Sequence, residues 1–256
     1  MKRGFYTIMS AQFFSSLADN ALFVAAVELL RTSGAPEWQR AALVPMFALF
    51  YVVLAPFVGA FADALPKGRV MFVSNAIKIV GCLMMLFGSH PLIAYAVVGL
   101  GAAAYSPAKY GILTELLPAS QLVKANGWIE GLTIASIILG VLLGGQLVGH
   151  HLSAALLSID IPMIDFGIHT AAEAAIAALI LVYALAAWFN TRIPHTGVEM
   201  RPLRQHPQRS ILASTLALLP DFWACNSRLW HDKLGQISLS TTTLFWGAGG
   251  NLKFIV

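Results

Sequence analysis

The stretch SSLADNALFVAAVELL, residues 15–30, carries a carboxylate and an amide, Asp19 and Asn20, inside an almost unbroken apolar run. Such a run is typical of a helix that crosses a lipid bilayer, which needs about 20 apolar residues. A charged side chain at the centre of such a helix costs about 2.5–3.5 kcal/mol by insertion scales. The sequence therefore predicts that Asp19 faces a polar partner or a cavity that water or a substrate can enter.

The composition of the whole chain agrees with lipid as its surroundings. Of the 256 residues, 58% are hydrophobic and only 11% are charged, and the mean hydropathy is +0.74. Soluble domains carry about 25% charged residues, so this chain has too few charges to cover a water-facing surface. The net charge of +4 is weak evidence for nucleic-acid binding, and we predict no nucleic-acid partner. The sequence indicates an all-α membrane protein.

Six apolar runs are long enough to span a bilayer as helices. We expect a six-helix transmembrane bundle over residues 1–189 and, from its prolines, a linker over 190–235. A seventh apolar run follows, and we expect residues 236–256 to be the start of a seventh transmembrane helix, within which the chain is truncated. The six expected spans cover about residues 5–30, 41–62, 70–88, 92–113, 127–149 and 168–189.

The positions of Lys and Arg predict the orientation, because cytoplasmic loops carry an excess of these residues. Eleven of them fall on the side of the N-terminus and the linker, and only Arg31 and Arg40 fall on the other side. The loop 150–167 contains neither residue type. We therefore expect a multi-pass protein whose N-terminus and linker are cytoplasmic.

Within the linker, apolar residues recur at helical spacing among charged ones. This pattern predicts a short helix that lies on the inner membrane surface, and a plain solvated loop is the alternative. The apolar residues that form the pattern are Phe222, Trp223, Leu229, Trp230 and Leu234.

The loop after the second span reads GAFADALPKGR, residues 59–69. Its small residues allow close packing of the helix end, and Asp63 is placed to interact with a helix N-terminus or with a nearby Arg. Lys67 and Arg69 are expected to face the cytoplasm. The order of Gly59, Asp63, Lys67, Gly68 and Arg69 resembles the signature loop of the major facilitator superfamily, and an ordinary basic cytoplasmic loop is the alternative.

A second stretch, GAAAYSPAKYGILTELLPASQLVKANGWIE, covers residues 101–130. Together with AQFFSSLADNALF near the N-terminus and LFWGAGG near the C-terminus, it is similar to the bacterial lysophospholipid transporter family of the same superfamily. The resemblance runs from about residue 10 to 150 and from about 220 to 256. It implies a major-facilitator-type six-helix bundle, corresponding to the N-terminal half of such a transporter plus the start of its seventh helix.

This resemblance implies a lysophospholipid transporter. Such a protein moves lysophospholipids, chiefly lysophosphatidylethanolamine, from the outer to the inner leaflet of the bacterial cytoplasmic (inner) membrane. An acyltransferase that re-acylates the product is then a candidate partner, beside the substrate and the membrane lipids. Two alternatives remain open: another major-facilitator exporter, of drugs or sugars, and a non-transporting, truncated membrane component.

Polar residues in and near the spans are the candidate substrate-binding groups. Asp19 is expected to meet an amine or a basic side chain, with Asn20 donating or accepting hydrogen bonds beside it. Lys78 could pair with Asp19 or with Glu130, and the sequence does not choose between them. Lys109 follows a helix-bending proline and could attract a lipid phosphate or anchor the helix at the surface. The candidates are Asp19, Asn20, Lys78, Lys109 and Glu130.

Contacts between helices are expected from two further signals. Gln12 and Asn75 are polar residues within spans and are candidates for interhelical hydrogen bonds. Gly140 and Gly144 have the small-xxx-small spacing that allows two helices to pack closely.

Patterns typical of an enzyme are missing from the sequence. The stretch GLGAAA, residues 99–104, fits a dinucleotide-binding pattern only formally, because it lies within an expected span and follows no strand. There is no Gly-x-Ser-x-Gly nucleophile elbow, and Cys82 and Cys225 match no metal-binding or redox spacing. We therefore predict a protein that is not an enzyme, with no catalytic residues, no metal site and no cofactor.

Overall fold

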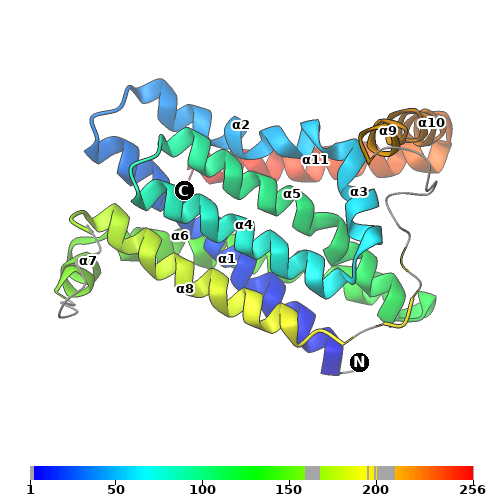
Figure 1. Ribbon diagram of the computed structural model, residues 1–256, viewed down its shortest axis with the longest axis horizontal. Coiled ribbons are helices and arrows are strands. Elements are labelled where there is room, and N and C mark those ends of the chain that lie inside the picture. Colours follow the sequence, from blue (N-terminus) through cyan, green and yellow to red (C-terminus); the bar gives the residue numbers. More distant parts are fainter. Residues whose placement is uncertain (1–2, 159–167, 195, 199, 201–210, 256) are drawn as a thin grey trace. The chain divides into compact units, whose positions relative to one another are not determined.

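A computed structural model describes residues 3–158, 168–194, 196–198, 200 and 211–255, and the regular structure among them is helical. The chain divides into two compact units, residues 1–202 and 203–256, which are described separately. Figure 1 shows the long helices of the first unit running side by side, with the short helix α3 inclined to them and α7 at one end. The helices of this unit are α1 (Arg3–Thr32), α2 (Glu37–Val53), α3 (Ala55–Ala64), α4 (Lys67–Leu86), α5 (Pro91–Leu116), α6 (Ala119–Val148), α7 (His150–Leu157) and α8 (Ala171–Thr191).

The first unit has the number of membrane spans that the sequence predicts. Helices α1, α4, α5, α6 and α8 are each long and apolar enough to cross a bilayer, and α2 with α3 makes a sixth span if the bent pair counts as one. Each predicted span overlaps its helix, although the helices start or end a few residues away from the predicted limits. The expectation of a six-helix bundle is confirmed.

The second span is not the straight helix that the sequence predicts over 41–62. It bends by 65° between α2 and α3, at Leu54. Pro56 lies in the first turn of α3, where it has no N–H to continue the hydrogen bonding of α2 and its ring clashes with the preceding turn. The proline therefore ends one helix and starts the next, and the prediction of one continuous helix was wrong.

Glycines bring the helices of the bundle into close contact. A Cβ atom on Gly140 would lie 2.6 Å from the backbone oxygen of Leu17, and one on Gly144 would lie 2.8 Å from that of Ala21. Backbone of α6 therefore packs directly against backbone of α1, as the small-xxx-small spacing predicts. On the other side of the bundle, Gly99 of α5 makes the same kind of approach to the backbone of α2.

Apolar side chains fill the bundle in two clusters. One is centred on Leu22, Leu43, Val98 and Leu179, and the other contains Ile8, Ile112, Leu113 and Ile129, all nearly inaccessible to solvent. Helix α1 contributes to both clusters and contacts α6 and α8 along its length. The middle of α1, which carries Asp19, is therefore held among three or more helices.

The expected loop 150–167 is partly helical. Residues His150–Leu157 form α7, and 159–167 lie outside the described residues. The next span begins with a capping box, in which the Thr170 side chain accepts from the backbone N–H of Glu173 and the Glu173 carboxylate accepts from that of Thr170. This pairing explains an acidic side chain at the start of an apolar helix.

The described part of the second unit, residues 211–255, contains three helices: α9 (Ile211–Leu216), α10 (Leu218–His231) and α11 (Lys233–Ile255). The expected linker is therefore partly helical. The predicted amphipathic helix is α10, but it ends at His231, so Leu234 belongs to α11 instead. The predicted start of a seventh span falls within α11, except for Val256, which lies outside the described residues. Its assignment to the membrane stays a prediction.

Candidate functional site

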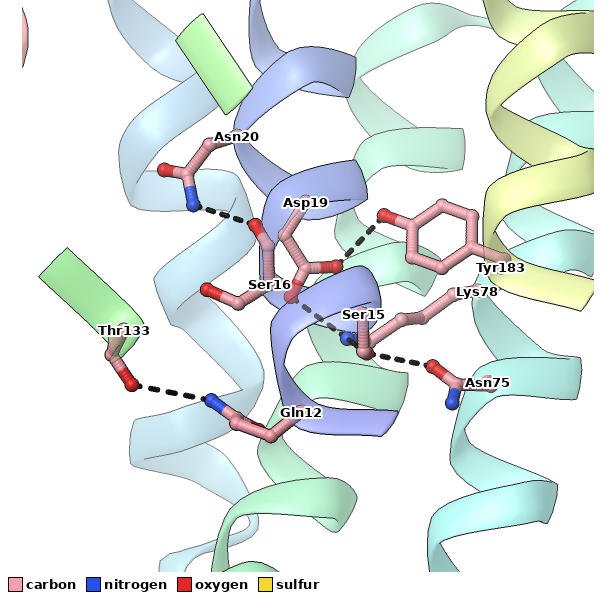
Figure 2. Close-up of polar contacts among 9 residues, drawn as sticks. All are labelled: Gln12, Ser15, Ser16, Asp19, Asn20, Asn75, Lys78, Thr133 and Tyr183. Carbon is pink, nitrogen blue, oxygen red and sulfur yellow. Dashed lines mark hydrogen bonds and ion pairs between the residues drawn. The ribbon is translucent and has the colours of Figure 1, made fainter. Parts of the chain in front are cut away.

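A buried ion pair joins three helices in the middle of the bundle. The carboxylate of Asp19 on α1 lies 2.8 Å from the ammonium nitrogen of Lys78 on α4. Its other oxygen accepts a hydrogen bond of 2.7 Å from the hydroxyl of Tyr183 on α8. Figure 2 shows Lys78 and Tyr183 approaching Asp19 from the same side of α1. Of the two partners that the sequence left open for Lys78, the structure selects Asp19 rather than Glu130.

Lys78 is enclosed by the groups that bind it. Its ammonium donates to the Ser15 hydroxyl at 2.9 Å, and Ser15 in turn donates to Asn75 Oδ1 at 2.7 Å. The ammonium also lies 5.2 Å from the ring centre of Tyr105 and 5.6 Å from that of Tyr183, within the range of cation–π attraction. The side chain is 1% exposed. A buried cation is tolerated when it is paired and hydrogen-bonded in this way.

Asp19 is the accessible side of this ion pair. Its side chain is 19% exposed, whereas that of Lys78 is 1% exposed. A carboxylate has room for about four hydrogen bonds, and Lys78 and Tyr183 supply two of them. The remaining capacity can accept an N–H or O–H group from a ligand, so the arrangement is suited to binding an ammonium group.

Asn20 does not join this cluster, although it follows Asp19 in the sequence. Its amide points away from Lys78 and Tyr183, as Figure 2 shows, and donates to the backbone oxygen of Ser16 at 2.7 Å. Its side chain lies at the contact with α6, where a Cβ on Gly140 would come within 2.9 Å of it. Successive residues of a helix point about 100° apart. The two side chains therefore point in different directions, and the expected role of Asn20 in substrate binding stays a prediction.

Lys109 and Glu130 belong to a second polar group, centred on Tyr110. The Tyr110 hydroxyl donates to Glu130 Oε1 at 2.6 Å, and the Lys109 ammonium lies 4.3 Å from the centre of the Tyr110 ring. Lys109 is buried, and Glu130 Oε2 is a buried oxygen with no hydrogen-bond partner among the described residues. No hydrogen bond or ion pair of these described groups reaches Asp19 or Lys78, so direct contacts do not join the five candidates into one network.

The signature loop is held together by Lys67. Its ammonium binds the Asp63 carboxylate at 2.5 Å and the backbone oxygen of Ala62 at 2.8 Å, and it lies 3.8 Å from Glu115 on α5. Lys67 is 8% exposed and so does not simply face the cytoplasm. The partner of Asp63 is therefore this lysine rather than an arginine.

The other residues of the loop differ in how tightly they are packed. Gly68 lies against α8, where its Cβ position is 3.1 Å from the backbone oxygen of Asn190. Gly59 has open space beside it, and Arg69 is exposed. A hollow of about 850 Å³ opens here between the loop, the end of α5 and residues 190–200, away from the Asp19 cluster.

The two interhelical hydrogen-bonding residues expected from the sequence are confirmed. Gln12 donates to Thr133 on α6 at 3.3 Å, and Asn75 accepts from Ser15. Sequence reasoning missed Ser15 and Tyr183, which complete the shell of the ion pair. Ser15 was detectable, because it lies four residues before Asp19 and hence on the same face of α1. Tyr183 lies 164 residues away in the sequence, and no local signal connects it to Asp19.

The described part of the chain contains no group of three or more His, Cys, Asp or Glu side chains that could hold a metal ion.

Comparison with known proteins adds the following. Residues 8–254 match the family model of the Major Facilitator Superfamily. The chain is 41% identical to the lysophospholipid transporter LplT of Yersinia enterocolitica serotype O:8 / biotype 1B (strain NCTC 13174 / 8081) and 40% identical to that of Yersinia pestis (strain Pestoides F). Both matches cover 100% of this chain and 56% of the relative, so the chain spans about half the length of these curated relatives.

A solved structure is similar in fold. It is the crystal structure of a bacterial homolog to the human lysosomal transporter Spinster, in an inward-facing and unoccupied conformation. The TM-score is 0.60 at 20% sequence identity, and the match covers 80% of this chain and 47% of the other. At that identity, the similarity supports the fold alone.

Proposed function

The chain belongs to the Major Facilitator Superfamily and is an integral membrane protein, and from that premise we propose that it serves in a lysophospholipid transporter. The proposed activity moves lysophospholipids, chiefly lysophosphatidylethanolamine, from the outer to the inner leaflet of a bacterial inner membrane. The identity of 41% along the whole chain to a relative named for lysophospholipid transport supports this substrate class.

The observation that carries the proposal is the buried pair of Asp19 and Lys78. Ionisable residues inside a membrane are costly and mark substrate or ion paths. Lysophosphatidylethanolamine carries an ammonium group, a phosphate and one acyl chain. The partly exposed carboxylate of Asp19 offers a binding partner to the ammonium group, and the apolar helices around it suit the acyl chain.

The second polar group extends this proposal toward the phosphate. Lys109 is a buried cation that lies over the ring of Tyr110, and it has no ion pair with a described carboxylate. An ammonium that lacks an anionic partner gains most from a ligand that supplies one. We assign Lys109 to the lipid phosphate, with Tyr110 and Glu130 holding it in place.

The complete transport path requires more than one bundle. In secondary transporters, the substrate site lies near the bilayer midplane between two structural repeats, and one repeat rocks against the other. This chain covers 56% of the length of its relatives. We therefore propose that the bundle supplies one wall of the path, and that the activity belongs to a protein with both walls.

The proposed orientation places the N-terminus and the signature loop in the cytoplasm. The structure groups the segments concerned at one end of the bundle: Gly4 lies against Pro194, Gly68 lies against Ile193, and Lys67 lies near Glu115. An excess of Lys and Arg marks this end in the sequence. Product delivered there is accessible to an acyltransferase, which we propose as the enzyme that consumes it.

The test is uptake of lysophosphatidylethanolamine in bacteria that lack their own transporter for it. The protein tested is a full-length chimera, in which residues 1–256 replace the matched part of the Yersinia enterocolitica relative. We expect labelled lysophosphatidylethanolamine to move from the outer to the inner leaflet when the chimera is present. A chimera that reaches the membrane in normal amounts and exports a drug or a sugar, while moving no lysophospholipid, would refute the proposal.

A further inference from the structure

The helix α10 has one apolar face and one polar face, and nothing in the proposed transport reaction uses it. At about 100° per residue, its large apolar residues fall within a sector of about 140°, and its charged residues fall on the other side. The apolar face, as we use the term below, consists of Leu218, Leu219, Phe222, Trp223, Leu229 and Trp230.

Much of the apolar face is uncovered within its own unit. Trp223 is 66% exposed, Trp230 is 59% exposed and Leu229 is 41% exposed. No residue of α10 is fully buried, although α10 contacts both α9 and α11. Three large apolar side chains exposed together on one helix are unusual for a water-facing surface and mark an interaction site.

We infer that α10 lies in the plane of the membrane, with its apolar face inserted at the boundary between head groups and acyl chains. Tryptophan favours this boundary, because its ring is apolar while its N–H still finds a hydrogen-bond partner. A strong separation of apolar and polar faces with low overall hydrophobicity distinguishes a helix that lies on a membrane from one that spans it. The face therefore fits a lipid surface.

Charge and connectivity support the bilayer as the occupant. The linker 190–235 contains six Lys or Arg and three Asp or Glu, which gives it a net charge of +3. Bacterial inner membranes contain anionic lipids, which attract basic segments. The segment from the end of α8 to the start of α10, residues 192–217, is attached to a membrane-spanning helix and so keeps α10 near a bilayer surface.

The two cysteines of the chain allow a direct test. Cys225 is exposed and lies beside Leu229 on the edge of the apolar face, whereas Cys82 is buried. In a Cys82→Ala background, a nitroxide attached to Cys225 reports on the apolar face. A matched variant with Cys225→Ser and Ala224→Cys reports on the polar face, because Ala224 is exposed and lies about 170° from the middle of the apolar face.

The measurement is the collision rate of each nitroxide with oxygen, which enriches in lipid, and with a water-soluble nickel chelate. The full chain is reconstituted in vesicles of phosphatidylethanolamine and phosphatidylglycerol. We expect the ratio of oxygen to nickel collisions to be several-fold higher at position 225 than at position 224. Replacing both Trp223 and Trp230 with Ser should reduce the ratio at position 225 toward that at position 224.

Three outcomes would overturn the inference. Equal ratios at the two positions would show that α10 is surrounded by water. Protection of position 225 from both reagents would show that protein, such as a second copy of the chain, covers the apolar face. An unchanged ratio in the variant without the tryptophans would show that these rings do not hold α10 in lipid. Because none of these readouts involves transport, failure here leaves the proposed substrate untouched.

Discussion

Lys78 is surrounded at its ammonium by the Asp19 carboxylate, the Ser15 hydroxyl and two tyrosine rings, and it is almost inaccessible to water. Removing one partner of a buried ion pair leaves an uncompensated charge, which costs about 3–5 kcal/mol. Replacing both partners removes both charges and is often close to neutral. The stability of the bundle should therefore depend on the pair as a unit.

This predicts a strongly non-additive mutant cycle. Asp19→Asn and Lys78→Met should each lower the free energy of unfolding by about 3–5 kcal/mol, and the double variant should lose much less than their sum. Unfolding of purified protein in detergent, followed by denaturant or heat, measures all four members of the cycle. Additive losses would show that the two residues do not interact in the folded protein.

The two tyrosines that flank Lys78 give a second prediction at this scale. Tyr183 donates to Asp19, whereas the buried Tyr105 hydroxyl has no hydrogen-bond partner among the residues that the structure describes. Tyr183→Phe should cost about 1.5–3 kcal/mol, because it removes a hydrogen bond to a charged group. Tyr105→Phe is the matched control and should be neutral or stabilising. Equal effects of the two substitutions in the same unfolding experiment would contradict this assignment.

At the scale of residues, the sequence predicts best those side chains whose charge would be costly to place in lipid. Asp19 and Lys78 were predicted because charges deep in apolar runs require partners. The choice of Asp19 over Glu130 required knowing that the Lys78 side chain of α4 reaches α1, and Tyr183 required the packing of α8 against α1. The orientation of Asn20 toward α6 was also missed, since the sequence alone does not fix how a helix is rotated in the bundle.

At the scale of elements, the contact between α1 and α6 depends on glycine at one face of α6. Gly144 faces α1, and a Cβ there would lie 2.8 Å from both the Ala21 backbone oxygen and the Val24 side chain. Gly145, the next residue, has nothing within 4 Å of its Cβ position. The two positions share one helix and one depth, so they form a matched pair.

We therefore expect Gly144→Ala to lower the midpoint of thermal unfolding in detergent and Gly145→Ala to leave it unchanged or raise it. Alanine favours the helix over glycine by up to about 1 kcal/mol at either position, but at Gly144 the backbones must move apart to admit the methyl group. If Gly144→Ala is as stable as Gly145→Ala, then α1 and α6 are not packed as closely as described.

The positions of the membrane-spanning segments could be predicted from the lengths of the apolar runs. The breaks in the helix within such a segment could not be predicted in this way. The sum of hydropathy over 41–62 indicates one span, and hydropathy does not report the missing N–H of Pro56 that bends it. Likewise, α7 is short and follows Gly149 directly, so hydropathy alone predicts a loop there. Backbone breaks depend on single residues, to which a window average is insensitive.

At the scale of the whole molecule, the proposed orientation predicts which ends of the bundle face the cytoplasm. In a Cys225→Ser background, a cysteine at exposed Arg69 should be blocked only by reagents that cross the membrane. A cysteine at exposed His151, at the opposite end, should react with an impermeant thiol reagent added outside intact cells. The reverse pattern of labelling would show that the protein has the opposite orientation.

The fold class of the molecule was predictable because two independent signals agree on it. Composition indicates a multi-span membrane protein, and the order of residues in the loop 59–69 resembles that of one superfamily, whose family model matches residues 8–254. The internal site is harder to predict from such a sequence, because its residues come from helices that are far apart in the chain.

The central claim is that Asp19, held in place by Lys78, contacts the lipid head group, and transport by the double variant tests it most directly. Because Asp19→Asn with Lys78→Met is expected to restore stability, a loss of transport in this variant is not explained by loss of protein. We predict that the full-length chimera carrying both substitutions takes up lysophosphatidylethanolamine at least about tenfold more slowly per molecule, since a hydrogen bond to a charged group contributes about 1.5–3 kcal/mol. Uptake per molecule equal to that of the unsubstituted chimera would contradict the claim and leave the pair a structural feature of the bundle.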